Sequence, residues 1–447
     1  MLIGQASINL TANILSALLG LLSVFVFTRL FSPHDYGTYL LGTGFASVIS
    51  VFLAGWFRNL VLSGHARNDG TDVRGLVASG FLLSCLTAPI AYGLGVLTGL
   101  HAAAAVAAIA LSIAIAFFDL TQDLIRARLR AFAVMRGTLV RSAGVLCLGV
   151  LVALVSPTGL VLLLSSTAAC LIAILVQSRT AWRGTMMVFD RADLAALARQ
   201  GLPLTVSLTL LAVSSVADRF VIANLVGAAD AGRYVAALDL VRQTLMLPAM
   251  SAAAALGFAM ISAHVANVVL GADFREIAAQ TMPIVAVAVI FQILTQQYLH
   301  ASFLLSGRNS FYLINTASII VANVILSCVL VESHGTVGAA WARLGADAIG
   351  FLCALVLSRS AFPVPLPAGR LALVMIAALI MALMVGALDR HLHVGDLTAC
   401  IVLACTGFCS YAALCWLFDI SRLRGRLKSG VALLRTKRAN LTIGPSP

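Results

Sequence analysis

Long apolar runs alternate with short polar gaps along almost the entire chain. The hydrocarbon core of a bilayer is about 30 Å thick, so a helix needs roughly 20 apolar residues to cross it. Inside lipid, such a run satisfies its own backbone only as a helix. The pattern therefore predicts an all-α polytopic membrane protein with about fourteen spans, at 6–28, 38–57, 76–98, 102–122, 138–156, 158–178, 201–226, 233–250, 252–270, 278–304, 311–331, 336–358, 370–388 and 397–418.

The gaps between these runs leave little room for a separate soluble domain, and several contain only about four residues. Such short connections force neighbouring helices into antiparallel pairs. The longest internal gap, 179–200, places Leu194 and Leu197 on one helical face, opposite Arg191 and Arg199. We expect it to form an amphipathic helix on the cytoplasmic surface, between two halves of similar size.

The two halves contain a repeated pattern. Gly37 and Tyr39 open the second span, and Gly232 and Tyr234 open the eighth in the same way, at an offset of 195 residues. Each half then begins on the same side of the membrane, which predicts two pseudo-symmetric lobes of about six helices, related as a parallel repeat, plus two C-terminal helices. The predicted units are an N-terminal lobe (1–178), the amphipathic linker (179–200), a C-terminal lobe (201–359), two additional spans (360–418) and a basic tail (419–447).

The second half is shorter than the first. The basic turn at Arg136 corresponds to the turn at Arg308, at an offset of only 172, so about 23 residues are missing between Gly232 and Arg308. A single span between Arg233 and Gly271 would reverse the direction of every later span. The sequence therefore predicts a shortened pair of spans over 233–270, either as two short helices with a tight turn near 248–255 or as a re-entrant pair.

Basic residues indicate the orientation of the spans. Of the 29 Lys and Arg residues, 21 lie in every second gap or in the C-terminal tail. Basic gaps are retained in the cytoplasm during insertion, so both termini are expected to be cytoplasmic. The net charge of +12 then follows from topology and, without an aromatic stacking run beside the basic residues, does not indicate nucleic-acid binding. Four arginines remain within apolar runs: Arg141, Arg219, Arg242 and Arg343.

Composition agrees with this interpretation. Hydrophobic residues make up 61% of the chain and charged residues 10%, with a mean hydropathy of +1.03. All nine cysteines lie in apolar runs without metal-ligand spacing, so we interpret them as small core residues and expect no disulfide, metal or cofactor. The first residues lack a basic region before their apolar run, so we expect the first helix to be retained in the protein.

Four segments resemble the Wzx-type polysaccharide transporter (flippase) family of the multidrug/oligosaccharidyl-lipid/polysaccharide exporter superfamily. The segments are Thr28 to Phe52, Gly201 to Leu240, Leu270 to Ile284 and Ser333 to Leu344. The resemblance implies a two-lobed, fourteen-helix fold that moves oligosaccharides linked to undecaprenyl diphosphate across the bacterial inner membrane by alternating access. O-antigen, capsule or exopolysaccharide synthesis would be the pathway. Membrane lipids and a polysaccharide polymerase or export machinery would be the partners, and the protein would be a monomer. The shortened pair departs from the family, whose members usually have a charged cytoplasmic loop there.

Ionisable groups inside a span are unfavourable unless they face protein or a water-filled cavity. Asp218 and Arg219 lie at a depth in span seven similar to that of Asp239 and Arg242 in span eight. One hypothesis is that Arg219 and Arg242 bind the diphosphate of the substrate, with the two aspartates tuning the charge or coupling a proton or cation. The alternative is that Asp239 pairs with Arg242 and Asp218 with Arg219, for structure alone.

Several neutral polar side chains also fall within apolar runs. They form two groups, one in the first span and one in the tenth, and they either line a cavity and bind sugar hydroxyls or hydrogen-bond between helices. The residues are Asn9, Asn13, Gln296, Gln297 and His300.

The remaining charged candidates lie near the cytoplasmic mouth or deeper in span twelve. Asp123 and Arg126 lie at the end of span four. They either form ion pairs within the charged cluster there or help to gate substrate entry. Arg141 lies one turn inside span five, where it can extend to the surface or join the same mouth. Arg343 and Asp347, four residues apart, are predicted to form a structural pair.

Three other functions remain as alternatives. A drug or cation antiporter and a lipid II flippase would share the fold, although intramembrane arginines favour an anionic substrate. A membrane glycosyltransferase or polymerase would need acidic residues in extracytoplasmic loops, and only Asp35 lies in the short first loop. The chain lacks a G-x-x-x-x-G-K loop for ATP. We therefore predict a transporter and not an enzyme.

Overall fold

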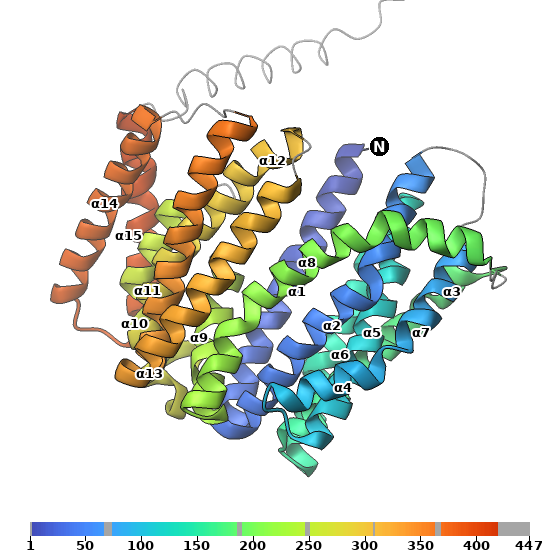
Figure 1. The fold of residues 1–447 in the computed structure, drawn as a ribbon. Helices are drawn as coiled ribbons and strands as arrows, with labels where there is room; N and C mark the ends of the chain where they lie inside the picture. The colour runs from blue at the N-terminus through green and yellow to red at the C-terminus, as the bar shows by residue number, and fades with distance from the viewer. Residues whose placement is uncertain are drawn as a thin grey trace, which may run out of the picture.

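The computed structural model describes residues 2–66, 74–185, 190–245, 251–306, 309–362 and 368–418, and the regular secondary structure of these ranges is entirely helical (Figure 1). Each of the fourteen predicted runs coincides with one helix, with part of a longer helix or with consecutive helices that follow one another along the chain. Many large apolar side chains point outward, such as Leu97, Leu175 and Val356, which are 83%, 70% and 66% exposed. An outward apolar surface of this extent suits contact with lipid. The all-α membrane fold predicted from the sequence is confirmed.

Seven helices form the N-terminal lobe. They are α1 (Leu2–Leu30), α2 (Pro33–Ala66), α3 (Arg74–Cys85), α4 (Ala88–Leu97), α5 (Ala102–Ala127), α6 (Ala131–Val155) and α7 (Gly159–Trp182). The helices α3 and α4 make one span that bends by 45° at its break. Pro89 lies at the second residue of α4, where a proline removes no helical hydrogen bond.

The remaining helices form the C-terminal lobe and a peripheral pair. They are α8 (Arg191–Leu225), α9 (Ala228–Leu245), α10 (Ser251–Val269), α11 (Ala272–Ile293), the π-helical η2 (Leu294–Leu299), α12 (His300–Ser306), α13 (Asn309–Ala361), α14 (Ala368–His391) and α15 (Asp396–Leu417). α13 contains two spans, because the chain turns at Gly335 with φ of 57° and ψ of −138°. Only glycine adopts this conformation without strain.

The segment predicted to be an amphipathic linker runs directly into a span. Asp190 caps α8 by accepting hydrogen bonds from the backbone N–H groups of Ala192 and Asp193, and the helix then continues without a break to Leu225. Leu194 is buried while Arg191 is exposed, as the amphipathic pattern requires. The first turns of α8 cross the N-terminal lobe in Figure 1.

Helix ends define two faces of the molecule. We call the face where α2, α5 and α7 end the basic face, and the face with the connections 31–32 and 98–101 the turn face. On the basic face, Arg128 donates to the carbonyl of Thr180 at 2.9 Å. On the turn face, the lobes touch each other: the rings of Tyr36 and Phe274 lie edge to face with their centroids 5.8 Å apart.

Equivalent residues of the repeat meet at the turn face. A Cβ atom on Gly37 would overlap the carbonyl oxygen of Ala228, and one on Gly232 would lie 2.6 Å from the carbonyl oxygen of Pro33. Pro33 and Ala228 are themselves equivalent, at the same offset of 195. Reciprocal contacts of this kind arise where two equivalent elements cross a two-fold axis. The predicted pseudo-symmetry of the lobes is therefore present in the packing of α2 against α9.

A second reciprocal pair joins the lobes further from this axis. Arg29, at the end of α1, donates to the carbonyl of Val269 at 2.6 Å, while its equivalent Asn224, at the end of α8, donates to the carbonyl of Thr98 at 3.1 Å. Val269 ends α10 and Thr98 follows α4. The helix α10 is thus the counterpart of the bent span α3 and α4.

The shortened pair consists of two oppositely directed helices. α9 begins on the turn face, where Arg233 donates to the carbonyl of Asp273 at 2.9 Å, and α10 returns to that face at Val269. α9 has 18 residues, whereas its counterpart α2 has 34. Most of the residues that the second half lacks are therefore missing from α9. With 1.5 Å per residue, each helix is about 27 to 29 Å long. The single-span alternative is excluded. Of the tight turn predicted near 248–255, residues 251–255 belong to α10, and residues 246–250 lie outside the described residues.

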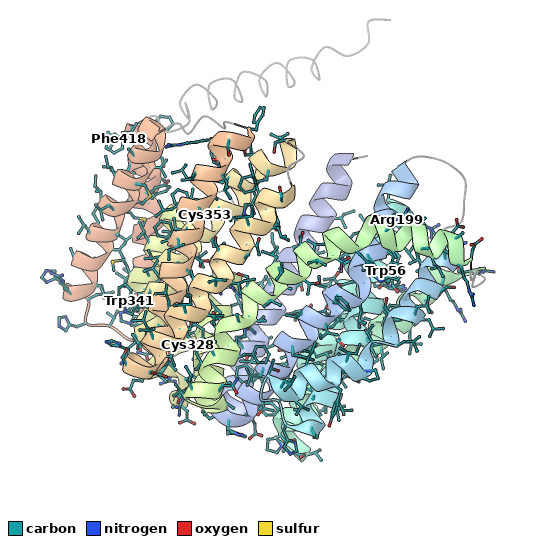
Figure 2. All side chains as sticks on the ribbon, in the orientation of Figure 1. Trp56, Arg199, Cys328, Trp341, Cys353 and Phe418 are labelled. Atoms are coloured by element: carbon teal, nitrogen blue, oxygen red, sulfur yellow. The ribbon has the colours of Figure 1, made fainter. Side chains whose placement is uncertain are left out.

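The cysteines are free thiols, but they are not all in the core. Cys170 is buried, whereas Cys147, Cys328, Cys405 and Cys409 are exposed on the outer surface. Figure 2 shows Cys328 on α13 at the side of the bundle. The expectation of a core position was wrong for these four, because a membrane protein places apolar residues on its exterior as well as in its interior.

Candidate functional site

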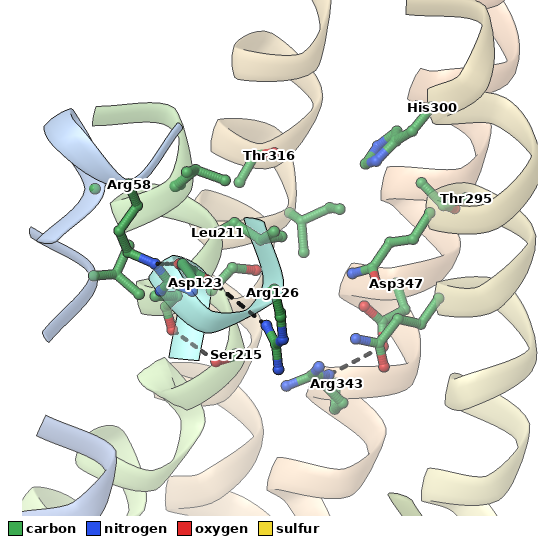
Figure 3. Close-up of a pocket in the computed structure, with 18 residues that line it drawn as sticks. Arg58, Asp123, Arg126, Leu211, Ser215, Thr295, His300, Thr316, Arg343 and Asp347 are labelled. Carbon is green, nitrogen blue, oxygen red and sulfur yellow. Dashed lines mark hydrogen bonds and ion pairs between the residues drawn. The ribbon is translucent and has the colours of Figure 1, made fainter. Parts of the chain in front are cut away.

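A cavity of about 620 Å³ lies between the two lobes (Figure 3). It adjoins the basic face: Arg126 is next to the last residue of α5, and His300 is the first residue of α12, one and a half turns from its end. On the turn face, the contacts between α2 and α9 close the space between the lobes. The lining residues come from α2 and α5 of the N-terminal lobe and from α8, α11, η2, α12 and α13, and they include Arg58, Asp123, Arg126, Ser214, Ser215, Gln292, Thr295, Gln296, His300, Thr316, Arg343 and Asp347.

The N-terminal lobe contributes a chain of four charged residues, of which all but Asp119 line the cavity. Asp123 is 2% exposed and accepts hydrogen bonds from Arg58 Nε at 2.6 Å and from Arg126 Nη1 at 3.3 Å. Arg58 also donates from Nη1 to Asp119 at 3.2 Å. The side chain of Arg126, which lines the cavity, is 52% exposed. Asp123 therefore holds two cations at the cavity wall.

The C-terminal lobe contributes a second charged group. Arg343 donates from Nε to Asp347 at 3.0 Å and from Nη1 to Asp218 at 3.1 Å. Asp218 is fully buried, and it also accepts from the hydroxyl of Tyr234 at 3.1 Å and from the backbone N–H of Arg219 at 3.0 Å. Buried charges require such partners, because an uncompensated charge in a medium of low dielectric is strongly unfavourable.

The four residues predicted to bind diphosphate come together, but with different partners and behind the cavity wall. Arg219 pairs across the helices with Asp239 at 3.1 Å. Arg242 donates to the carbonyl of Ser215 at 3.4 Å, and its Nη2 is buried without a partner among the described residues. None of Asp218, Arg219, Asp239 and Arg242 lines the cavity in this conformation, because the α8 residues that do are Leu208 to Ser215, about one turn nearer the basic face.

The other predicted residues divide into those that line the cavity and those that do not. The residues that line the cavity are Gln296, His300, Asp123, Arg126, Arg343 and Asp347. Asn13 is exposed on α1, and Arg141 places its guanidinium 5.1 Å from the ring centre of Phe118; neither lines the cavity. The side chains of Asn9 and Gln297 lie outside the described residues.

Sequence analysis missed Arg58, Thr295 and Thr316 as cavity residues. Arg58 was assigned to a basic cytoplasmic gap, although α2 continues for eight residues beyond it. The sequence contained one indication that Arg58 belongs to the helix: it directly follows an apolar run, and no turn residue separates it from that run. Thr295 and Thr316 gave no signal, since threonine is common in membrane helices.

The fold and the cavity together define a polytopic membrane protein with two lobes around a central site. The chain belongs to the polysaccharide biosynthesis protein family, whose sequence model matches residues 3–261. This confirms the family resemblance found in the sequence. A comparison of the sequence with curated proteins finds no match.

Solved structures with the same fold include a flippase and a multidrug transporter. The lipid II flippase MurJ, in an inward closed conformation, superposes with a TM-score of 0.77 at 13% identity, covering 92% of this chain and 98% of that one. A multidrug resistance MATE family transporter of the MOP superfamily, in an outward-facing conformation, gives a TM-score of 0.51 at 14% identity, covering 80% of this chain and 94% of that one. At these identities the similarity establishes the fold.

Proposed function

We propose that the protein translocates oligosaccharides linked to undecaprenyl diphosphate across the bacterial inner membrane, by alternating access of the central cavity. The observation that carries this proposal is the presence of Arg58, Arg126 and Arg343 on the wall of a cavity within an apolar bundle. Guanidinium groups bind phosphate oxygens through paired, charge-assisted hydrogen bonds. The family match to polysaccharide biosynthesis proteins supports a glycan as the attached group.

Arg126 and Arg343 suit a diphosphate that is shared between the lobes. In Figure 3 these two side chains, one from α5 and one from α13, point toward one another across the cavity. Two cations that face each other are stabilised when an anion binds between them. A diphosphate held by both would connect the lobes, so its arrival and departure would favour different separations of the lobes.

The distribution of basic residues supports the direction of entry. Basic connections are retained in the cytoplasm, and the cavity adjoins the basic face while the lobes are in contact at the turn face. In this orientation both termini are cytoplasmic, and the conformation described is ready to receive substrate from the cytoplasmic side. A cation substrate is disfavoured, because the accessible charge of Arg126 is positive.

The function is tested with Arg126→Ala in cells that depend on this protein for surface polysaccharide. Loss of charge-assisted hydrogen bonds to phosphate should reduce export by about tenfold or more at equal protein level. Arg136→Ala is the matched control, because Arg136 lies on the same face but donates to the carbonyl of Val176 outside the cavity. Normal export by Arg126→Ala would contradict the proposal.

Lipid II transport is the second candidate, favoured by the similarity to MurJ. Lipid II transport is tested in the same cells after their own lipid II flippase has been depleted. We expect the protein not to restore growth, since the family match is to polysaccharide biosynthesis; rescue of growth would instead assign it to lipid II.

A further inference from the structure

The span built from α11, η2 and α12 contains a π-helical turn within the apolar bundle, Leu294–Leu299. Such turns are rare, because the wider helix loses packing and hydrogen-bond geometry, and they occur frequently at functional sites. Here Thr295 and Gln296 lie within the turn and Gln292 lies just before it, and all three line the cavity. The turn thus places polar side chains at one wall of the cavity.

Thr295 has an unusual hydrogen-bonding state. It is 1% exposed, and its Oγ1 has no partner among the described residues. Other threonines in these helices donate to the preceding turn, as Thr281 does to the carbonyl of Ile277 at 2.7 Å and Thr316 does to that of Tyr312 at 2.9 Å. A buried hydroxyl without a partner is unfavourable. A ligand hydroxyl in the cavity would supply the missing partner.

The neighbouring lining residues have the same chemistry. His300 is 4% exposed, its Nε2 lies 3.0 Å from Asn315 Nδ2, and its ring lies 4.6 Å from that of Tyr312. Its orientation is thus held by packing and by an amide. Figure 3 shows Thr295 and His300 on the opposite side of the cavity from Arg58 and Asp123. Amides, hydroxyls and an imidazole form a neutral wall that can both donate to and accept from sugar hydroxyls.

We infer that Gln292, Thr295, Gln296, His300 and Thr316, which we call the polar wall, form the subsite for the sugar next to the diphosphate and accept a neutral pyranose. This inference rests on the proposed function. The arginines would bind the headgroup common to all such lipids, and the polar wall would distinguish one glycan from another. A site that hydrogen-bonds sugar hydroxyls discriminates strongly, because a wrong sugar leaves buried polar groups unpaired.

Thr295→Val tests the inference, since it keeps the shape of the side chain and removes the hydroxyl. The probes are undecaprenyl diphosphate without sugar and the same lipid carrying glucose, galactose or N-acetylglucosamine, with binding to the purified full chain measured by native mass spectrometry. We expect the best-bound glycosylated lipid to lose about tenfold in affinity and the sugar-free lipid to be unaffected. Thr209→Val is the matched control: its Oγ1 is also buried without a partner among the described residues, but it does not line the cavity.

The outcomes separate this inference from the proposed function. Arg126→Ala should weaken the binding of every diphosphate lipid, with or without sugar. An unchanged affinity for all lipids in Thr295→Val, or an equal loss for the sugar-free lipid, would overturn the polar wall as a sugar subsite. So would a wild-type protein that binds no glycosylated lipid more tightly than the sugar-free one. If the wild type binds none of the diphosphate lipids, the proposed function itself fails.

Discussion

Single buried charges determine how the C-terminal lobe is held together. The carboxylate of Asp218, in α8, accepts hydrogen bonds from Tyr234 of α9 and from Arg343 of α13. One carboxylate therefore joins three helices, of which α13 is distant in sequence from α8 and α9. Asp239, by contrast, is 25% exposed at its side chain and, within the described part of the chain, accepts only from Arg219. The two aspartates look alike in the sequence but differ in what their loss would leave unpaired.

We predict that Asp218→Asn lowers the free energy of unfolding by about 3 kcal/mol. All three partners of Asp218 are donors, so an amide NH₂ there would face a donor and leave Arg343 undercompensated. Asp230→Asn, the matched control, should change it by less than about 1 kcal/mol, since its pair with Arg233 is partly exposed on both sides. Thermal unfolding of both variants in detergent measures the difference, and equal shifts in Tm would contradict this account.

His264 illustrates a residue whose environment sequence analysis did not identify. Its ring nitrogens lie 2.6 Å from Asp396 and 2.9 Å from Asp389. These carboxylates belong to the start of α15 and the end of α14, so His264 joins the peripheral pair to α10 at the turn face.

At the scale of elements, backbone conformation decides where the long helix α13 becomes two spans. The turn depends on Gly335, whose missing Cβ would meet nothing within 4 Å. The requirement for glycine there is therefore conformational and not a matter of space. The sequence suggested a boundary at this point, but only the dihedral angles show why the turn needs no longer loop.

We predict that Gly335→Ala destabilises the protein by about 1–3 kcal/mol through backbone strain. Gly93→Ala is the control, because Gly93 also has open space at its Cβ but lies inside helix α4, where alanine is favoured by about 0.5–1 kcal/mol. The two variants should shift Tm in opposite directions. A similar effect of both would rule out the conformational explanation.

For the whole molecule, the reciprocal contact of α2 with α9 is the place where the lobes are closest. The carbonyls of Pro33 and Ala228 pack directly against Gly232 and Gly37. Any residue with a Cβ atom would block this approach. The two glycines therefore permit the lobes to meet at the turn face. The alternating-access proposal then requires this contact to open when the cavity closes at the basic face.

We predict that Gly37→Ala separates the lobes at the turn face, because the added methyl group would overlap the carbonyl of Ala228. Spin labels at Val155 and Asp273, both exposed on that face in different lobes, report the distance between the lobes in a cysteine-free background. The distance distribution should shift to longer values in Gly37→Ala and remain unchanged in Gly93→Ala. An unaltered distribution in Gly37→Ala would show that this contact does not control closure.

Local sequence patterns were sufficient for the all-helical membrane fold, the repeat, the shortened pair and the family, because hydrophobic length, glycine position and basic residues act within one helix or one connection. The tertiary structure decided which charged residues reach the cavity. Arg126 and Arg343 line it while Arg219 and Arg242 lie behind its wall. Helix rotation and packing between distant segments set this difference, and neither is encoded in the spacing of residues along a single run.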